Sequence, residues 1–248
     1  MKRTRILLLA VLLLLTSCQG ERGPAGPAAL PVQIIGEIRI SAIYDPMADL
    51  IVAGTPSIPE ANINGLACLR AWEPSITSQF LFELYDVPVA PGDSVHLTVD
   101  YARSDGNPAQ ARVDMLMPGP FTYTMAAPED TITFHRGEDL AFAWTQPPGA
   151  EGVTAQCQIF YTYLDSSGWY GNWDYFYSGW LTDTTLVLPA AEIFPDSIGS
   201  LVWTSGYFVV SACGGPREED DPDNVTGDGC GRFQAWTSLP RIFLKPVE

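Results

Sequence analysis

Apolar and polar residues alternate along most of the chain after residue 32, with the period of two that is typical of β-strands. In residues 94–101, for example, Val95, Leu97 and Val99 alternate with polar side chains. Turn sequences rich in Pro, Gly, Asn and Asp separate such segments, at residues 91–93, 104–108 and 118–120. The pattern predicts short antiparallel strands, each with one buried and one solvated face.

Helical periodicity is weak by comparison. After the N-terminal region no segment of ten or more residues has an apolar stripe of period 3.6, and residues 189–194 predict one short helical turn. Many short strands separated by turn signals are typical of β-sandwiches. We therefore predict an all-β protein with two antiparallel β-sandwich domains, at residues 33–124 and 125–248.

The start of the second domain has a more specific pattern. Residues 128–130 (PED) and 137–144 (GEDLAFAW) resemble the first two strands of bacterial immunoglobulin-like and fibronectin type III-like modules. Leu140, Phe142 and Trp144 share one face of the second of these strands. The resemblance extends over about residues 126–248, and it implies that Trp144 packs in the core between two sheets.

The N-terminus begins with basic residues, followed by an apolar run at residues 6–15 and the tetrapeptide LTSC at residues 15–18. Ten apolar residues are too few to span a bilayer, so the segment reads as a signal peptide. The tetrapeptide resembles the lipobox of bacterial lipoproteins, which implies a signal peptide at residues 1–17 and lipidation of Cys18. Gln19 resembles the residue that follows the lipidated cysteine in lipoproteins sorted to the outer membrane. The alternative is an ordinary signal peptide with an incidental cysteine.

A short Gly-Pro segment follows the proposed lipid site. Residues 20–28 (GERGPAGPA) are three Gly-X-Y triplets, which resemble the collagen-like stubs of some bacterial surface lipoproteins. Three triplets are too few to form a triple helix alone. We expect residues 18–32 to act as an extended spacer that holds the folded domains away from the membrane.

The charge balance excludes some partners. The chain has 13 basic and 29 acidic residues, for a net charge of −16, and loss of the signal peptide would make it three units more negative. Such a chain has no basic surface for nucleic acid or anionic lipid headgroups. We expect no nucleic-acid partner, and membrane contact through the lipid anchor alone. The hydrophobic fraction of 46% is ample for a packed core.

Aromatic residues are concentrated between residues 160 and 180, where ten of 21 residues are Phe, Trp or Tyr. Residues 166–174 read as a loop or hairpin tip, so some of these rings are expected at the surface. The candidate ligand-binding residues are Trp169, Tyr170, Trp173 and Trp180. Three readings stay open: the rings pack on one another, they contact an extracellular protein, or they stack on the sugars of a glycan.

Four cysteines remain after Cys18. Cys213 and Cys230 flank one loop at the ends of two strand-like segments, which predicts a disulfide between them in an exported protein. Cys68 and Cys157 lie in apolar surroundings and can be buried as small hydrophobic residues.

The loop between Cys213 and Cys230 is acidic, and clustered carboxylates are the ligands that Ca²⁺ prefers. The tentative metal ligands are Asp220, Asp221, Asp223 and Asp228. Their spacing does not match an EF-hand, and a solvated loop tip is the alternative.

Evidence for catalysis is thin. The two histidines, His96 and His135, fall in different predicted domains. The sequence contains no G-x-S-x-G, H-E-x-x-H or C-x-x-C motif and no phosphate-binding Gly-rich loop. We therefore assign no catalytic residue and expect a non-catalytic binding, adhesion or structural protein at the bacterial cell surface. Carbohydrate binding through residues 169–180 is the alternative; a hydrolase would need a carboxylate pair visible only in three dimensions.

Overall fold

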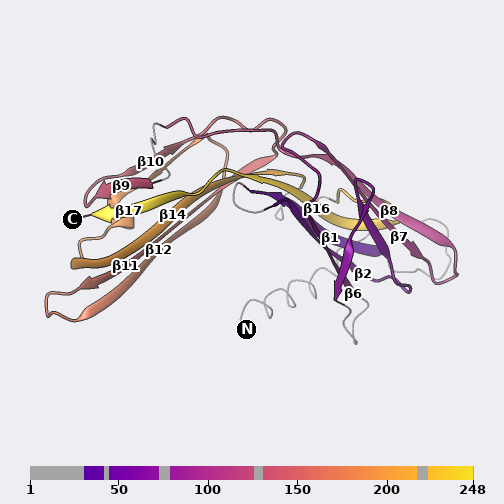
Figure 1. Ribbon diagram of the computed structural model, residues 1–248, viewed down its shortest axis with the longest axis horizontal. Coiled ribbons are helices and arrows are strands. Elements are labelled where there is room, and N and C mark those ends of the chain that lie inside the picture. The colour runs from indigo at the N-terminus through magenta and orange to yellow at the C-terminus, as the bar shows by residue number, and fades with distance from the viewer. Residues whose placement is uncertain (1–30, 42–44, 73–78, 126–130, 217–222, 248) are drawn as a thin grey trace.

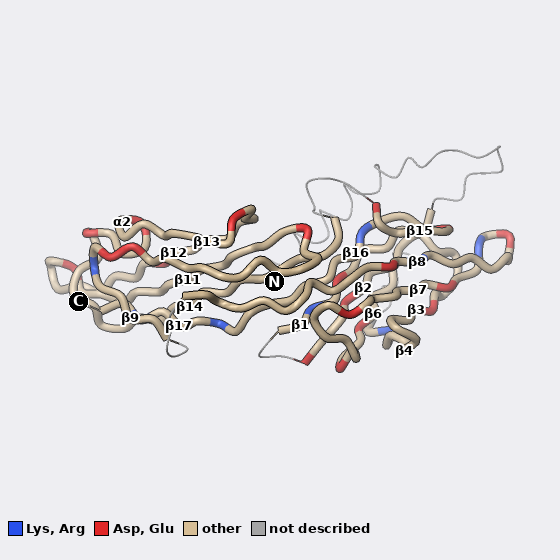
Figure 2. Tube along the Cα trace, turned by 90° about the horizontal axis from the view of Figure 1, so that it is seen from above, with Lys and Arg blue, Asp and Glu red and all other residues tan. Residues whose placement is uncertain are grey.

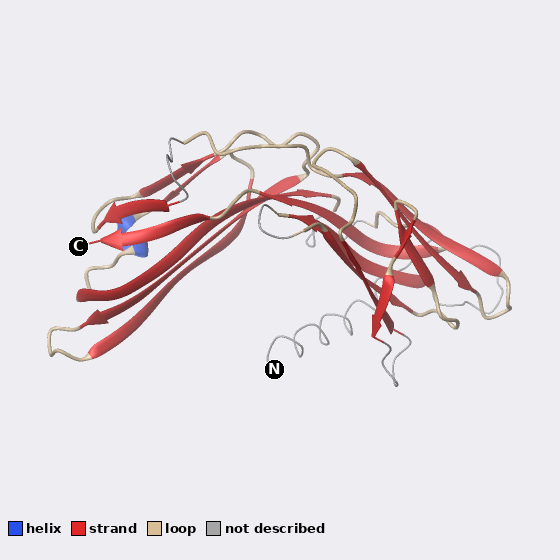
Figure 3. Ribbon diagram, in the orientation of Figure 1, coloured by secondary structure: helices blue, strands red, loops and turns tan. Residues whose placement is uncertain are grey.

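The computed structural model describes residues 31–41, 45–72, 79–125, 131–216 and 223–247. Within them the fold is almost entirely β-structure, as Figure 3 shows, and the prediction of an all-β protein is confirmed. The helix there, α2 (Ala190–Ile193), is a single turn within the segment for which the sequence predicts one. Its first turn follows Pro189, whose fixed φ suits a helix start.

The strands divide into those before and those after residue 130. The first group is β1 (Val32–Ile40), β2 (Met47–Ala53), β3 (Glu60–Ile63), β4 (Leu66–Ala67), β5 (Leu69–Trp72), β6 (Gln79–Tyr85), β7 (Ser94–Ala102) and β8 (Pro108–Leu116). The second group is β9 (Thr131–His135), β10 (Leu140–Ala143), β11 (Gly152–Leu164), β12 (Tyr170–Leu181), β13 (Thr185–Leu188), β14 (Ser200–Gly214), β15 (Thr226–Gly227), β16 (Gly229–Ser238) and β17 (Ile242–Val247).

One large sheet runs through both halves of the molecule. Its order is β12-β11-β14-β16-β1-β2-β6-β5, with β17 paired to β14 and β9 paired to β17. Neighbouring strands are antiparallel except for β1 with β16 and β17 with β9, which are parallel. Two smaller sheets, β15-β8-β7-β3-β4 and β10-β13, complete the fold.

Two hydrophobic clusters lie on one face of the large sheet. In the first, Ile34 and Leu50 of the large sheet pack with Val95 and Leu97 of β7. In the second, Ile159 and Phe208 of the large sheet pack with Phe142 of β10, among others. Each half is thus a pair of stacked sheets with the apolar side chains between them.

The two halves are set at an angle, and Figure 1 shows the molecule as an arch. Strands β11 and β12 of one half and β2 and β6 of the other lie along its inner, lower side. Figure 2 shows Asp and Glu spread over both halves, with fewer Lys and Arg among them.

The structure differs from the predicted pair of sandwiches mainly because both halves contribute strands to one large sheet. Val225, Phe233 and Ala235, all after residue 125, belong to the first cluster. Phe233 and Ala235 do so because β16 pairs in parallel with β1, with Val32 opposite Gly229. The domain boundary between residues 124 and 125 stays a prediction, to which the structure adds that β16 completes the N-terminal core.

The predicted Cys213–Cys230 disulfide is absent from the structure, which holds no disulfide among its described cysteines. Cys213 on β14 lies opposite Trp236 of β16. Cys230 is six residues farther along that strand, which corresponds to about 20 Å at about 3.3 Å per residue. A disulfide needs Cα atoms within about 7 Å, so this fold cannot form the predicted bond.

The predicted signal peptide, the lipidated Cys18 and the spacer up to residue 30 lie outside the described residues. In the part of the chain that is described, no helix is both long and apolar enough to cross a membrane.

Three carboxylates form a row on the uncovered face of the N-terminal half. Glu37 of β1 lies opposite Asp49 of β2, which lies opposite Glu83 of β6. Burial, and then the charges of Glu37 and Glu83, raise the pKa of the Asp49 carboxyl above its usual range. Because this pKa is higher in the folded protein than in the unfolded chain, the free energy of unfolding falls as pH rises through that interval.

We therefore expect Asp49→Asn to stabilise the protein at pH 7, where the wild-type carboxylate is charged. Like charges placed directly opposite across strands cost roughly 0.2–1 kcal/mol, and a gain of that order is expected. The gain should shrink below the raised pKa, where Asp49 is protonated. Urea unfolding at pH 7 and pH 3 measures the gain, with exposed Asp45→Asn as the control. Equal gains at both pH values would contradict the explanation.

Candidate functional site: an aromatic face of the large sheet

Strands β11 and β12 form a long hairpin that carries most of the aromatic cluster. Their pairing is unbroken and ends with Leu164 opposite Tyr170. In the turn between them, the Asp165 carboxylate accepts the backbone N–H of Trp169 at 2.9 Å. Gly168 takes a φ of +77°, which glycine adopts without strain. The turn fixes the register, and the register decides which face each ring occupies.

Strand β12 divides its aromatic rings between the two faces of the sheet. Trp173, Tyr175 and Tyr177 point inward and pack against the second hydrophobic cluster. Tyr170 and Phe176 alternate with them, point outward, and are 72% and 58% exposed. The hairpin therefore carries aromatic rings on both faces, but only one face is covered.

Strand β14 places further rings beside those of β12. Trp203 lies opposite Thr162 of β11 and is 57% exposed. Tyr207 of β14 lies opposite Phe243 of β17, which extends the line of rings by one strand. We define the aromatic face as the uncovered side of β12, β11, β14 and β17 with its outward rings: Phe160, Tyr170, Phe176, Trp203, Tyr207 and Phe243.

The aromatic face is hollowed across β12, β11 and β14. The hollow has a volume of about 290 Å³ and is open to solvent. Its aromatic lining residues are Phe160, Tyr161, Trp173 and Trp203, of which Phe160 and Trp203 point outward, and Thr162, Asn172 and Asp174 supply its polar side chains. Ligand sites commonly combine an apolar lining with a few polar groups that fix orientation.

Hydrogen bonds hold some of these polar side chains in place. The Thr162 hydroxyl donates to the Asn172 amide oxygen at 3.0 Å. Gln156 Nε2 donates to the Tyr207 hydroxyl at 2.9 Å, and the guanidinium carbon of Arg241 lies 4.8 Å from the centroid of the Tyr207 ring. The face is therefore ordered by its own contacts before any ligand binds.

The groups beneath the aromatic face are held neutral. Burial raises the pKa of the Cys157 thiol and of the Tyr175 hydroxyl, each to about 12. Burial also raises the pKa of Tyr161, whose hydroxyl donates to the Ile193 carbonyl oxygen. These side chains are protonated at neutral pH, so they support the rings above them by packing.

The structure separates the four residues that the sequence proposed as ligand contacts. Tyr170 lies on the aromatic face, and Trp169 lies in the turn just before β12, where it is 76% exposed. Trp173 points inward, with its ring centroid 5.4 Å from that of Tyr161. Trp180 lies at the other end of β12, on the same side of the sheet as Tyr170, with its ring centroid 5.7 Å from that of Trp236.

Sequence reasoning missed Trp203 and Phe243 altogether. Both are far from residues 160–180 along the chain and reach the aromatic face only through the pairing of β14 with β11 and of β17 with β14. No local pattern indicates which strand either residue joins. Phe160 and Phe176 were within the aromatic segment, and the alternation of β12 could have placed Phe176 outward.

The proposed calcium ligands do not come together where the structure describes them. The Asp223 carboxylate accepts the backbone N–H of Val225 and of Gly231, at 2.8 and 2.9 Å. The Asp228 carboxylate contacts Arg103 instead. Asp220 and Asp221 lie outside the described residues, and among described residues no group of three His, Cys, Asp or Glu is arranged to hold a metal ion. The calcium site stays a prediction.

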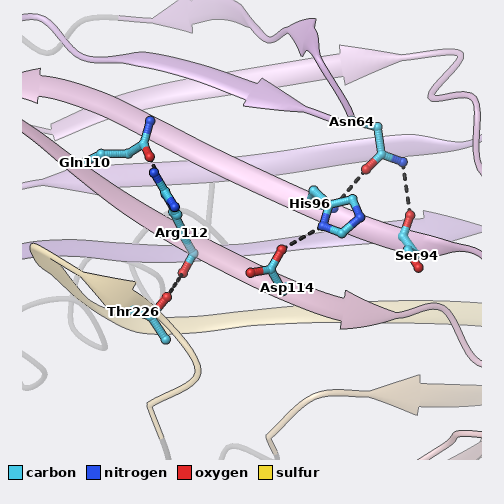
Figure 4. Close-up of polar contacts among 7 residues, drawn as sticks. All are labelled: Asn64, Ser94, His96, Gln110, Arg112, Asp114 and Thr226. Atoms are coloured by element: carbon cyan, nitrogen blue, oxygen red, sulfur yellow. Dashed lines mark hydrogen bonds and ion pairs between the residues drawn. The ribbon is translucent and has the colours of Figure 1, made fainter.

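The polar contacts around His96 lie on the smaller β15-β8-β7-β3-β4 sheet of the N-terminal half. Figure 4 shows His96 on β7 and Asp114 on β8, with 2.6 Å between Nδ1 and the carboxylate oxygen. Asn64 accepts the His96 backbone N–H and donates to the Ser94 carbonyl, while Thr226 joins β15 to β8. These bonds tie strands together on an exposed surface. His135 belongs to β9, in the other half.

Comparison with known proteins adds little to what the strands themselves show about the fold. No family model matches the sequence, and no curated protein matches it significantly. Among solved structures, the fibronectin type III-like modules of Clostridium thermocellum CbhA have 12% identity and a TM-score of 0.27, over 86% of this chain and 95% of theirs. Tandem Ig repeats of Dlar have 12% identity and a TM-score of 0.24, over 84% of this chain and 98% of theirs.

A 1.5-MDa bacterial ice-binding adhesin is a further similar structure, with 11% identity and a TM-score of 0.22, over 87% of this chain and 66% of that chain. The class of the protein, an all-β fold of paired sheets, follows from its own strands.

Proposed function

We propose that this chain is a non-catalytic, lipid-anchored surface protein of a bacterial cell envelope, and that it binds its ligand through the aromatic face. The observation that carries the proposal is the set of exposed rings on neighbouring strands of one sheet, with β11 paired to both β12 and β14. Exposed apolar area costs free energy in water, roughly 25 cal/mol per Å², and binding recovers it. Exposed apolar groups gathered on one face and bordered by polar residues commonly mark interaction sites or ligand-binding grooves.

The rigidity of the strands supports a binding role. Phe160 and Trp203 belong to neighbouring inner strands of the large sheet, and the backbone of β11 is paired on both sides, with β12 and with β14. A ligand that binds such preformed groups has little conformational entropy to remove. The raised pKa of the Cys157 thiol, together with its burial, makes it a packing residue and not a nucleophile.

The anchor is proposed from the sequence. Lipidation of Cys18 would attach the chain a short distance before β1, which begins at Val32. Two or more acyl chains hold a protein stably at a membrane, whereas one does so only marginally. We expect Cys18→Ala to abolish incorporation of labelled palmitate and to release the protein from membranes or trap its precursor. Membrane retention of the variant without acyl label would contradict lipidation.

The binding role is tested by site-specific photo-crosslinking in the native bacterium. A benzophenone amino acid at position 203 or 176 should give macromolecular adducts, because both positions lie on the aromatic face. The same amino acid at position 85 is the control, since Tyr85 is also exposed but lies on β6 in the other half. Adducts from position 85 alone, or from none of the three positions, would contradict the proposed function.

A further inference from the structure

We infer that the aromatic face binds a neutral polysaccharide, with Trp203 and Phe160 stacking on sugar rings while Asn172 and Asp174 bind their hydroxyl groups. The inference rests on the proposed function and names the ligand class for the same site. Pyranose rings have apolar C–H faces and a polar rim of hydroxyl groups. A surface that recognises them must offer flat rings and hydrogen-bonding groups side by side.

Strand pairing creates that arrangement in two adjacent rows. In one row Asn172, Thr162 and Trp203 lie on neighbouring strands. In the next row Asp174 and Phe160 lie opposite each other, followed by a serine of β14. Each row spans two strand spacings, about 10 Å, and the rows are about 7 Å apart. Every row therefore holds one aromatic ring and at least one polar side chain.

The polar groups are set up to bind hydroxyls. The amide oxygen of Asn172 is engaged by Thr162, so its Nδ2 hydrogens are the donors available to a ligand. The exposed Asp174 carboxylate is purely an acceptor when ionised. One donor and one acceptor on the same edge of the hollow match a sugar hydroxyl, which can accept and donate at once.

The negative charge of the aromatic face favours neutral over anionic polysaccharides. Asp174 lies in the hollow, and the whole chain carries a net charge of −16. The guanidinium of Arg241 lies over the Tyr207 ring, at the side of the face away from Asn172. An anionic polymer would meet a negative hollow on a negative protein, so the ligand is a neutral one.

The pattern also favours a glycan over a protein partner. Protein interfaces have a desolvated core of contiguous apolar groups surrounded by a polar rim. Here the rings are interrupted within each row by Thr162, Asn172 or Asp174, which leaves no continuous apolar centre.

Affinity electrophoresis tests the inference with the full chain in detergent micelles. The gels contain a neutral polysaccharide (β-glucan, α-glucan, xylan, mannan or galactan) or an anionic one (alginate or polygalacturonate). At least one neutral polymer should retard the wild-type protein, and Trp203→Ala should weaken that binding by about tenfold or more. Trp203→Tyr keeps a ring and should keep most of the affinity.

Trp169→Ala is the matched control, because it removes the same side chain from the turn outside the aromatic face. It should bind like the wild type, and equal melting temperatures of all variants establish that they are folded. Retardation by no neutral polymer, stronger binding to the anionic ones, or a larger loss in Trp169→Ala than in Trp203→Ala would each overturn the inference. Protease-sensitive crosslinks from position 203 without polysaccharide binding would refute the glycan and leave the binding role intact.

Discussion

Replacing Gly231 with alanine should destabilise the protein by about 4 kcal/mol or more, a loss reserved for severe steric conflicts. Gly231 has a φ of +124°, in the region that side chains rarely adopt. A Cβ at this position would overlap the carbonyl oxygen of Ile34, which lies opposite Gly231 on β1. The alanine would therefore force apart β16 and β1, the strands on which the N-terminal cluster depends.

Gly168→Ala is the control for this experiment. Gly168 also has a positive φ, +77°, but a Cβ there would meet no atom within 4 Å. Its cost should stay near the backbone contribution of about 1 kcal/mol. Urea unfolding of both variants gives the two free energies of unfolding. Similar values for both would show that the contact between Gly231 and β1 is looser than described.

The second large effect is expected for Phe208→Ala, with a loss of about 3–5 kcal/mol. Phe208 is fully buried on β14, and its ring stacks on that of Phe142 with 3.6 Å between centroids. Because Phe142 belongs to the smaller β10-β13 sheet, this contact joins the two layers of the C-terminal half. Truncation would leave a cavity between the layers.

Phe243→Ala provides the comparison, since it removes the same side chain from the uncovered side of the sheet. Phe243 is 54% exposed, and its loss should change the free energy of unfolding by no more than about 0.5 kcal/mol. Thermal unfolding followed by near-ultraviolet circular dichroism measures both variants. A comparable loss for Phe243→Ala would mean that the aromatic face contributes to stability and is not held available for a ligand.

Local alternation predicted the strands well because one side of each strand is buried. Val95, Leu97 and Val99 are buried in the first cluster, as their spacing in residues 94–101 indicated. Trp144 is likewise buried in the second cluster, as the resemblance to immunoglobulin-like modules implied. These features depend on neighbours in sequence, which is why the sequence reveals them.

The sequence could not reveal how strands distant along the chain pair with one another. The aromatic segment was evident, but which of its rings stay exposed depends on what covers each face of the hairpin. Trp203 joins the site only because β14 pairs with β11. The Cys213–Cys230 prediction was wrong for the same reason: the ends of a loop were taken as neighbours, whereas β16 pairs with β14 near its own far end.

The parallel pairing of β16 with β1 has a consequence for the order of folding. Val32 lies at the beginning of the described chain, and its partner Gly229 follows nearly all the other strands. The ribosome completes the chain from the N-terminus, so β1 to β8 are made long before Phe233 exists to fill their cluster. Structures dominated by such distant pairings fold slowly. The N-terminal half therefore stays incomplete, with an open strand edge, until β16 has been made.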